Sequence, residues 1–198
     1  LRTDLRDDQK QKIPTGYLQR LLDEESSNNK LHLQWLMQKD VLRQDALLVG
    51  QSSNLQRGRL ALAYAELTQQ PVEVLTISAD TTESDLKQRR RLVHHDNASG
   101  STNIEFINQA PVRAAIEGHL LIIDGIQYAE RNVLPTLNNL LENRELPLED
   151  GRMLVARQVM NDERFVPVHP DFRIVALFSN NSKLDPPVRS RFQIRRVD

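Results

Sequence analysis

Asp124 stands at the carboxyl end of four apolar residues, 120–123, and Gly125 follows it. A continuous apolar run predicts a strand of a parallel sheet, because both faces of such a strand are covered. In α/β folds the carboxyl ends of the strands form the ligand side. A carboxylate there can help to hold Mg²⁺ beside nucleotide phosphates. A core strand ending at a solvated turn would have the same residues, so the rest of the chain must decide between the two.

A second candidate for phosphate chemistry is the turn after the apolar run 46–49. Its residues are Gly50, Gln51, Ser52, Ser53, Asn54, Leu55, Gln56 and Arg57. A strand, a turn and a helix form the setting of a phosphate loop, whose pattern is Gly, four residues, then Gly-Lys-Ser/Thr. Leu55, Gln56 and Arg57 occupy the last three signature positions. By its pattern alone the turn is an ordinary connection between a strand and a helix.

The elements that must position these residues are five predicted strands. They begin near residues 46, 72, 120, 173 and 193 and alternate with predicted helices. This order predicts a three-layer α/β domain with a mostly parallel sheet, whose last strand lies at an edge. Asp150 and Gly151 predict the turn of a β-hairpin. Residues 157–170 are expected to be irregular, and residues 1–12 frayed or extended.

Two stretches allow more than one interpretation. Lys87 to Arg91 carries four cations in five positions, which favours a solvated helix face over a rim patch for phosphate or an acidic partner. Leu33, Leu36, Met37 and Val41 recur near the helical repeat and predict the buried face of a helix.

Composition sets limits on the class of protein. The chain has 198 residues, 39% hydrophobic and 27% charged, with a net charge of −1. These values fit a globular domain, and no overall field points to nucleic acid or a membrane. There is no cysteine and no apolar run near the roughly 20 residues that span a bilayer. No targeting segment is visible.

An ordered set of motifs carries a family resemblance. It comprises the turn at Gly50, residues 80–86, 118–124, 132–142, 169–173 and 184–192. From about residue 31 to 195 this set resembles the AAA+ ATPases of the MoxR, midasin and dynein group. Residues 130–135, 141–145 and 148–152 resemble one member of that group in particular.

The resemblance implies a fold and a setting. It implies a P-loop NTPase core of strand order 5-1-4-3-2, with β-hairpin inserts after the second strand and around 144–156. Residues 1–30 would be an N-terminal extension, and residues 31–198 the large AAA+ subdomain without its helical lid. The implied setting is a long mitochondrial matrix protein with further AAA modules and a metal-binding von Willebrand A domain. ATP and Mg²⁺ would be its cofactors, and other modules of the chain or ring its partners.

The resemblance also implies roles for single residues. Asp124 takes the place of the Walker B aspartate, which would help to hold Mg²⁺ if nucleotide binds. Ser179 or Asn180 falls where the first sensor positions the attacking water. Arg191 matches the arginine finger better than Arg189 does. An arginine finger acts on a neighbouring site and contributes about 10³–10⁵ in rate.

Three positions depart from the family pattern. Gly125 stands where a glutamate would polarise the water, Gln56 replaces the phosphate lysine, and Arg57 replaces the Mg²⁺-binding hydroxyl. These departures predict a degenerate module that shapes a ring, hydrolyses little or no ATP itself and lends Arg191 to a neighbour. Two alternatives stay open at this point. One is an active ATPase with a nonstandard loop, and the other is a nucleotide-free scaffold that binds proteins through its hairpin and the 87–91 cations.

Overall fold

The fold is described from a computed structural model, which covers residues 5–24, 27–51, 54–94, 102–130, 133–157, 162–179 and 186–197. The helices are α1 (Asp7–Lys10), α2 (Tyr17–Asp23), α3 (Ser27–Val41), α4 (Asn54–Thr68), α5 (Glu83–Leu86), α6 (Ala110–Glu117), η1 (Ile126–Tyr128), α7 (Leu134–Glu142) and α8 (Pro186–Ser190). The strands are β1 (Ala46–Gly50), β2 (Val72–Thr76), β3 (Gln88–His94), β4 (Thr102–Asn108), β5 (Leu120–Asp124), β6 (Leu146–Pro147), β7 (Met153–Val155), β8 (Phe165–Pro167), β9 (Arg173–Ser179) and β10 (Gln193–Arg196). Across these ranges no helix has the length and apolar character needed to cross a membrane.

The central sheet has five strands in the order β10-β1-β9-β5-β2, and every pair is parallel. Numbered along the chain, the five strands read 5-1-4-3-2, so the predicted order is confirmed. The last strand, β10, lies at one edge as predicted, and β2 forms the other edge.

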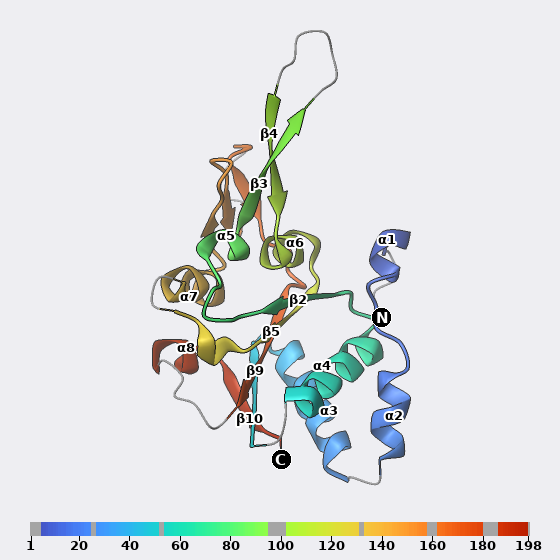
Figure 1. The fold of residues 1–198 in the computed structure, drawn as a ribbon. Helices are drawn as coiled ribbons and strands as arrows, with labels where there is room; N and C mark the ends of the chain where they lie inside the picture. Colours follow the sequence, from blue (N-terminus) through green and yellow to red (C-terminus); the bar gives the residue numbers. More distant parts are fainter. Residues whose placement is uncertain are drawn as a thin grey trace.

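Each strand buries alternate side chains on opposite faces of the sheet, as the two-residue period of a strand requires. Leu47, Leu121 and Ile123 belong to a core shared with α6 and α7, while Leu48 and Ile122 belong to a core shared with α2, α3 and α4. Figure 1 shows these two helical layers on either side of the sheet. The predicted three-layer α/β architecture is therefore confirmed.

Two β inserts stand on one side of this core. The β3 and β4 strands pair antiparallel and project away from the body, beyond α5 and α6 (Figure 1). The β6 and β7 strands form the hairpin predicted at Asp150 and Gly151. The strand β8 adds to β7 in parallel, so residues 157–170 were wrongly expected to be irregular throughout. A strand of three residues carries too little pattern to be recognised in the sequence.

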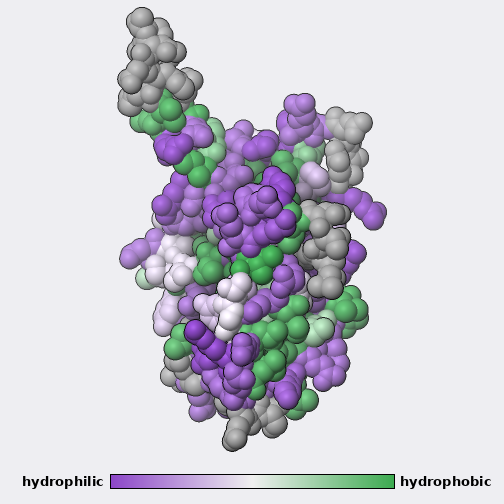
Figure 2. All heavy atoms as spheres, turned by 90° about the vertical axis from the view of Figure 1, so that its right-hand side faces the viewer, coloured by the Kyte–Doolittle hydropathy of each residue, from purple (hydrophilic) through white to green (hydrophobic). Residues whose placement is uncertain are grey.

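The cations at 87–91 do not form a helix face, because residues 88–94 are β3. Lys87 is buried, and its Nζ lies 2.5 Å from a Glu83 carboxylate oxygen. The three arginines that follow pair with Asp85, Glu149 and Glu105. Because each cation has a carboxylate partner, the stretch offers no unpaired basic patch. The hairpin instead exposes apolar side chains, Leu92 and Ile104, and Figure 2 shows hydrophobic residues beside hydrophilic ones on it.

The apolar spacing in α3 predicts a longer buried face than the helix has. Leu33 and Leu36 are buried, but Met37 is 45% exposed and Val41 is 82% exposed. Both lie in the last two turns of the helix, where they border an open apolar hollow of about 540 Å³ that they share with Leu42. Spacing alone cannot show where the neighbouring elements stop covering a helix.

Residues 5–12, the described part of the stretch expected to be frayed or extended, include the short helix α1 and join a polar cluster through Lys12. The backbone N–H of Val72 in β2 donates to the Lys12 carbonyl at 3.1 Å. The buried carboxylate of Glu73 accepts from Lys12 Nζ and Arg113 Nη2, each at 2.7 Å, and His119 Nδ1 lies 3.8 Å away. Burial raises the pKa of Glu73, but His119 together with the hydrogen bonds from Arg113 and Lys12 lowers it by more, so the net pKa is well below its usual range.

This depressed pKa predicts how stability depends on pH. The folded protein holds Glu73 ionised more strongly than the unfolded chain does, so the contribution is present above the unfolded pKa of about 4.3 and is lost progressively as pH falls below that value. We expect Glu73→Gln to unfold at a lower urea concentration than the wild type at pH 7, and to lose less further stability between pH 5 and 3.5. Equal pH slopes for the two proteins in urea titrations would contradict this role.

Candidate nucleotide site

The ends of three adjacent strands meet where the sequence places the phosphate chemistry. Gly50 at the end of β1 is in register with Ser179 at the end of β9. Asp124 at the end of β5 is in register with Leu177 of β9. Parallel pairing thus brings Gly50, Ser179 and Asp124 to one edge of the sheet, although they are far apart in the sequence. Ser52, Ser53 and Asn180 lie outside the described residues.

Among the described residues, the first turn of α4 presents neither the lysine nor the hydroxyl of a phosphate loop. The α4 helix starts at Asn54, Leu55 is 71% exposed, and Gln56 is partly exposed. Arg57 is 0% exposed and, among the residues that the structure describes, is the largest of the fully buried side chains. The sequence shows only that position 57 lacks a hydroxyl, and it does not predict that Arg57 is buried, since arginine is almost never fully buried unless paired. No signal in the sequence would have found it.

Gly125 adopts a conformation that leaves no room for a side chain. Its φ is +81°, in the left-handed region that favours glycine. A Cβ built on it would lie 2.6 Å from the Ile77 carbonyl oxygen and 3.1 Å from Tyr128 Cδ2. The chain then enters the single turn of η1, Ile126–Tyr128. The position next to Asp124 therefore lacks a carboxylate and also the space that a carboxylate would need.

Arg191 is held within its own module. Its Nε donates to Glu142 Oε2 at 3.0 Å, its Nη2 makes a closer contact with the same oxygen, and its Nη1 donates to the Pro187 carbonyl. Arg189, which precedes it in α8, is exposed. Within the part of the chain that the structure describes, no group forms a hydrogen bond or an ion pair with the Arg189 side chain.

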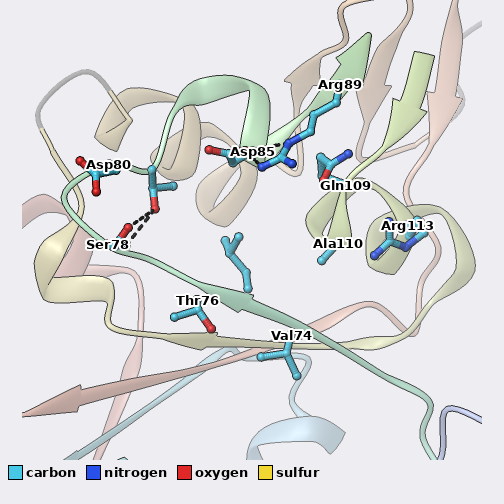
Figure 3. Close-up of a pocket in the computed structure, with 11 residues that line it drawn as sticks. Val74, Thr76, Ser78, Asp80, Asp85, Arg89, Gln109, Ala110 and Arg113 are labelled. Carbon is cyan, nitrogen blue, oxygen red and sulfur yellow. Dashed lines mark hydrogen bonds and ion pairs between the residues drawn. The ribbon is translucent and has the colours of Figure 1, made fainter. Parts of the chain in front are cut away.

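A polar cleft of about 390 Å³ lies beside β2 rather than over the predicted site. Figure 3 shows Val74 and Thr76 below it, Ser78 and Asp80 on the side of the 78–85 loop, and Gln109, Ala110 and Arg113 from the α6 side. Neither Gly50 nor Asp124 lines this cleft.

The charges in the cleft compensate one another. Asp85 pairs with Arg89, as the dashed lines in Figure 3 show. Burial raises the pKa of Asp85, while the Thr82 N–H, Arg89 and the Thr82 hydroxyl lower it by more, so this carboxylate stays ionised and neutralises Arg89. On the α6 side, Arg113 is bound to Glu73. The cleft consequently offers an incoming anion no uncompensated guanidinium.

The residues present do not fit a Mg²⁺–ATP complex. Asp124 and Ser179 supply oxygen atoms at the sheet edge, but a cation, Arg57, stands where Mg²⁺ needs a hydroxyl ligand. Gln56 cannot supply the charge that a lysine gives to the β- and γ-phosphates. No step of hydrolysis is therefore assigned to this edge of the sheet.

Comparison with known proteins places the chain in a family. Residues 45–192 match the family described as AAA domain (dynein-related subfamily). The chain belongs to this family, and its sheet is that of an AAA+ P-loop NTPase.

Individual relatives refine this assignment. Mouse von Willebrand factor A domain-containing protein 8 is 43% identical over an alignment of 203 positions, gaps included, that covers 93% of this chain and 10% of that protein. An uncharacterized protein of Staphylococcus aureus is 25% identical over 163 residues, 79% of this chain and 56% of that protein. The chain thus spans about a tenth of the mouse relative and little more than half of the bacterial one.

Two solved structures share the fold. A point mutant of RuvB from Thermotoga maritima has a TM-score of 0.56 and 19% identity, covering 89% of this chain and 47% of that one. A putative ATPase from Cytophaga hutchinsonii has a TM-score of 0.57 and 14% identity, covering 96% of this chain and 49% of that one.

Proposed function

We propose that this chain is a nucleotide-free AAA+ module of a larger mitochondrial ATPase made of several such modules. It shapes the ring and lends Arg191 to the ATP site of a neighbouring module, where ATP and Mg²⁺ bind and hydrolysis takes place. The likeness to von Willebrand factor A domain-containing protein 8, a much longer protein, supports a setting among other modules.

The observation that carries this proposal is the backbone at Gly125. A general base contributes about 10²–10⁴ in rate, and the position that would hold it is closed by the Ile77 carbonyl. Gln56 and Arg57 remove contacts to phosphate and Mg²⁺ in addition, which weakens binding as well as chemistry. Since base, lysine and hydroxyl are all missing, a nonstandard active site would need three separate substitutes.

The arginine finger is compatible with the ion pair that Arg191 makes in its own module. The Glu142 side chain is 56% exposed, and ion pairs at such exposure contribute about 0–1 kcal/mol. An arginine finger contributes about 10³–10⁵ in rate, or roughly 4–7 kcal/mol in the transition state. The gain at the neighbouring site therefore exceeds the loss of the Glu142 pair.

Titration of the purified chain with labelled ATP tests the first part of the proposal. We expect no saturation up to millimolar ATP, with or without Mg²⁺, and no phosphate release above a buffer blank. A module of the same family that has the full Gly-x4-Gly-Lys-Thr loop serves as the positive control. Saturable binding in the micromolar range would overturn the nucleotide-free assignment.

Substitution of Arg189 and Arg191 in the assembled multi-module protein tests the second part. We expect Arg191→Ala to lower steady-state hydrolysis by at least about 10³ at the site that Arg191 serves, and the matched variant Arg189→Ala to have little effect. Glu142→Ala should leave hydrolysis unchanged, which separates the finger from the ion pair. A large loss with Arg189→Ala alone would transfer the role to Arg189, and unchanged hydrolysis in both variants would refute a finger from either arginine.

A further inference from the structure

The buried Arg57 is the feature of the site that the family assignment leaves unexplained. Arg57 is the fourth residue of α4, and side chains on a helix lean back toward its N-terminus. The guanidinium is thereby directed toward the end of β1. Full burial of Arg57, at 0% exposure, shows that this direction leads into the protein and away from solvent.

Gly50 marks where the guanidinium lies. A Cβ built on Gly50 would be 2.5 Å from Arg57 Nη1 and 2.1 Å from the Val197 carbonyl oxygen. The guanidinium and this carbonyl thus converge on the bare α-carbon of Gly50. In a phosphate loop, the missing side chain of such a glycine lets the backbone approach a phosphate. In this chain, the space beside Gly50 is occupied by Arg57 and by the segment after β10.

The same contacts connect three elements. Val197 is buried, and its N–H donates to the Val49 carbonyl of β1 at 2.7 Å. Arg57 comes from α4, Gly50 from β1, and Val197 follows β10. The Arg57 guanidinium thus lies where the end of the strand, the start of the helix and the last described segment of the chain come together.

Electrostatics make the placement selective. An ionised side chain costs several kcal/mol to bury unless hydrogen bonds or an opposite charge compensate it. A fixed positive charge at this point also repels a divalent cation and takes the place of the oxygen atom that would bind it. Replacing the hydroxyl by arginine therefore changes which ligand the site accepts, beyond removing one contact.

We propose that Arg57 is a specificity-determining residue that braces β1, α4 and the segment after β10 in place of a nucleotide, and that it excludes Mg²⁺–ATP from the module. The module then keeps one shape whatever the nucleotide concentration is. This inference rests on the proposed function, because it explains why a degenerate module stays folded without a ligand.

Thermal unfolding of the purified chain tests the brace. We expect Arg57→Thr to lower the Tm by about 10 °C, and Arg57→Lys, which keeps the charge but loses the planar fork, to lower it by an intermediate amount. The matched control is Arg59→Thr in the same helix, since Arg59 is 35% exposed and pairs with Glu24. The control should shift the Tm by no more than about 2 °C. An equal, small shift for Arg57→Thr and Arg59→Thr would overturn the brace.

Restoring the phosphate lysine tests exclusion of Mg²⁺–ATP, which a merely structural role would not affect. We expect Gln56→Lys, which keeps Arg57, to show no saturable binding of labelled ATP with Mg²⁺ up to millimolar concentration. Gln56→Lys with Arg57→Thr should bind with a Kd below about 1 mM, and omitting Mg²⁺ should weaken this binding. Circular dichroism at the titration temperature establishes that the double variant is folded.

The single variant makes this test independent of folding losses. Because Gln56→Lys leaves the brace intact, micromolar binding of Mg²⁺–ATP to it would overturn the exclusion by Arg57 even if every Arg57 variant unfolded. Saturable binding to the wild-type chain would instead refute the proposed function itself. The two failures are therefore distinguishable in one series of titrations.

Discussion

Asp45→Asn is expected to destabilise the fold by about 3–5 kcal/mol, because it removes one partner of a buried ion pair. Arg144 Nη2 lies 2.8 and 2.7 Å from the two Asp45 carboxylate oxygens, and the Ile174 N–H donates to one of them at 3.0 Å. The Gln193 N–H donates to the Asp45 backbone carbonyl at 2.9 Å. Asp45 therefore joins the starts of β1, β9 and β10 to the loop after α7, and urea titration at pH 7 would measure its contribution.

Two comparisons separate the buried pair from a generic loss of charge. Asp162→Asn breaks an exposed pair with Arg164, and we expect it to be indistinguishable from the wild type. Asp45→Asn combined with Arg144→Met removes both charges and should recover part of the lost stability, since an uncompensated buried cation no longer remains. If Asp45→Asn and Asp162→Asn had the same unfolding midpoint, the pair would have no structural role.

Gly125→Glu, which restores the residue type of an active AAA+ site, is expected to lower stability without creating hydrolysis. A side chain at φ +81° costs about 1–2 kcal/mol, and its Cβ would lie 2.6 Å from the Ile77 carbonyl oxygen, a clash that adds about 1–3 kcal/mol. Denaturant unfolding measures the loss, and phosphate release from labelled ATP measures hydrolysis.

Gly151→Glu is the matched control for this substitution. Gly151 has a φ of +85°, but a Cβ built on it would meet nothing within 4 Å. The control therefore carries the backbone strain without the clash, and we expect it to lose only about 1–2 kcal/mol. Equal losses for both variants would show that the Ile77 carbonyl moves aside, and ATP hydrolysis by Gly125→Glu would show that the catalytic position is available after all.

The sequence by itself determined the sheet. Continuous apolar runs such as 120–123 identify buried parallel strands, because covering both faces leaves no position for a polar residue. The position of Asp124 and Gly50 at strand ends follows from the same runs. Ser179 lies in register with Gly50 since parallel strands in one sheet end at one edge.

Local pattern was insufficient where a partner from elsewhere in the chain decides the structure. Lys87 to Arg91 looked like a solvated helix face, yet residues 88–94 form a strand whose cations meet carboxylates of α5, β4 and the β6–β7 turn. These ion pairs depend on the pairing of β3 with β4 and on the position of the β6–β7 turn. The residue period within one segment cannot predict them. Likewise, the exposure of Met37 and Val41 depends on where neighbouring elements end.

At the candidate site the sequence determined which groups are missing, and only the tertiary structure decided what replaced them. The absence of a lysine at Gln56 and of a glutamate at Gly125 is visible in the letters alone. The sequence does not show that the Ile77 carbonyl closes the space at Gly125. It also does not show that Arg57 is buried near Gly50 and the Val197 carbonyl. These contacts join residues far apart in the chain, and close packing brings them together only after the sheet has formed.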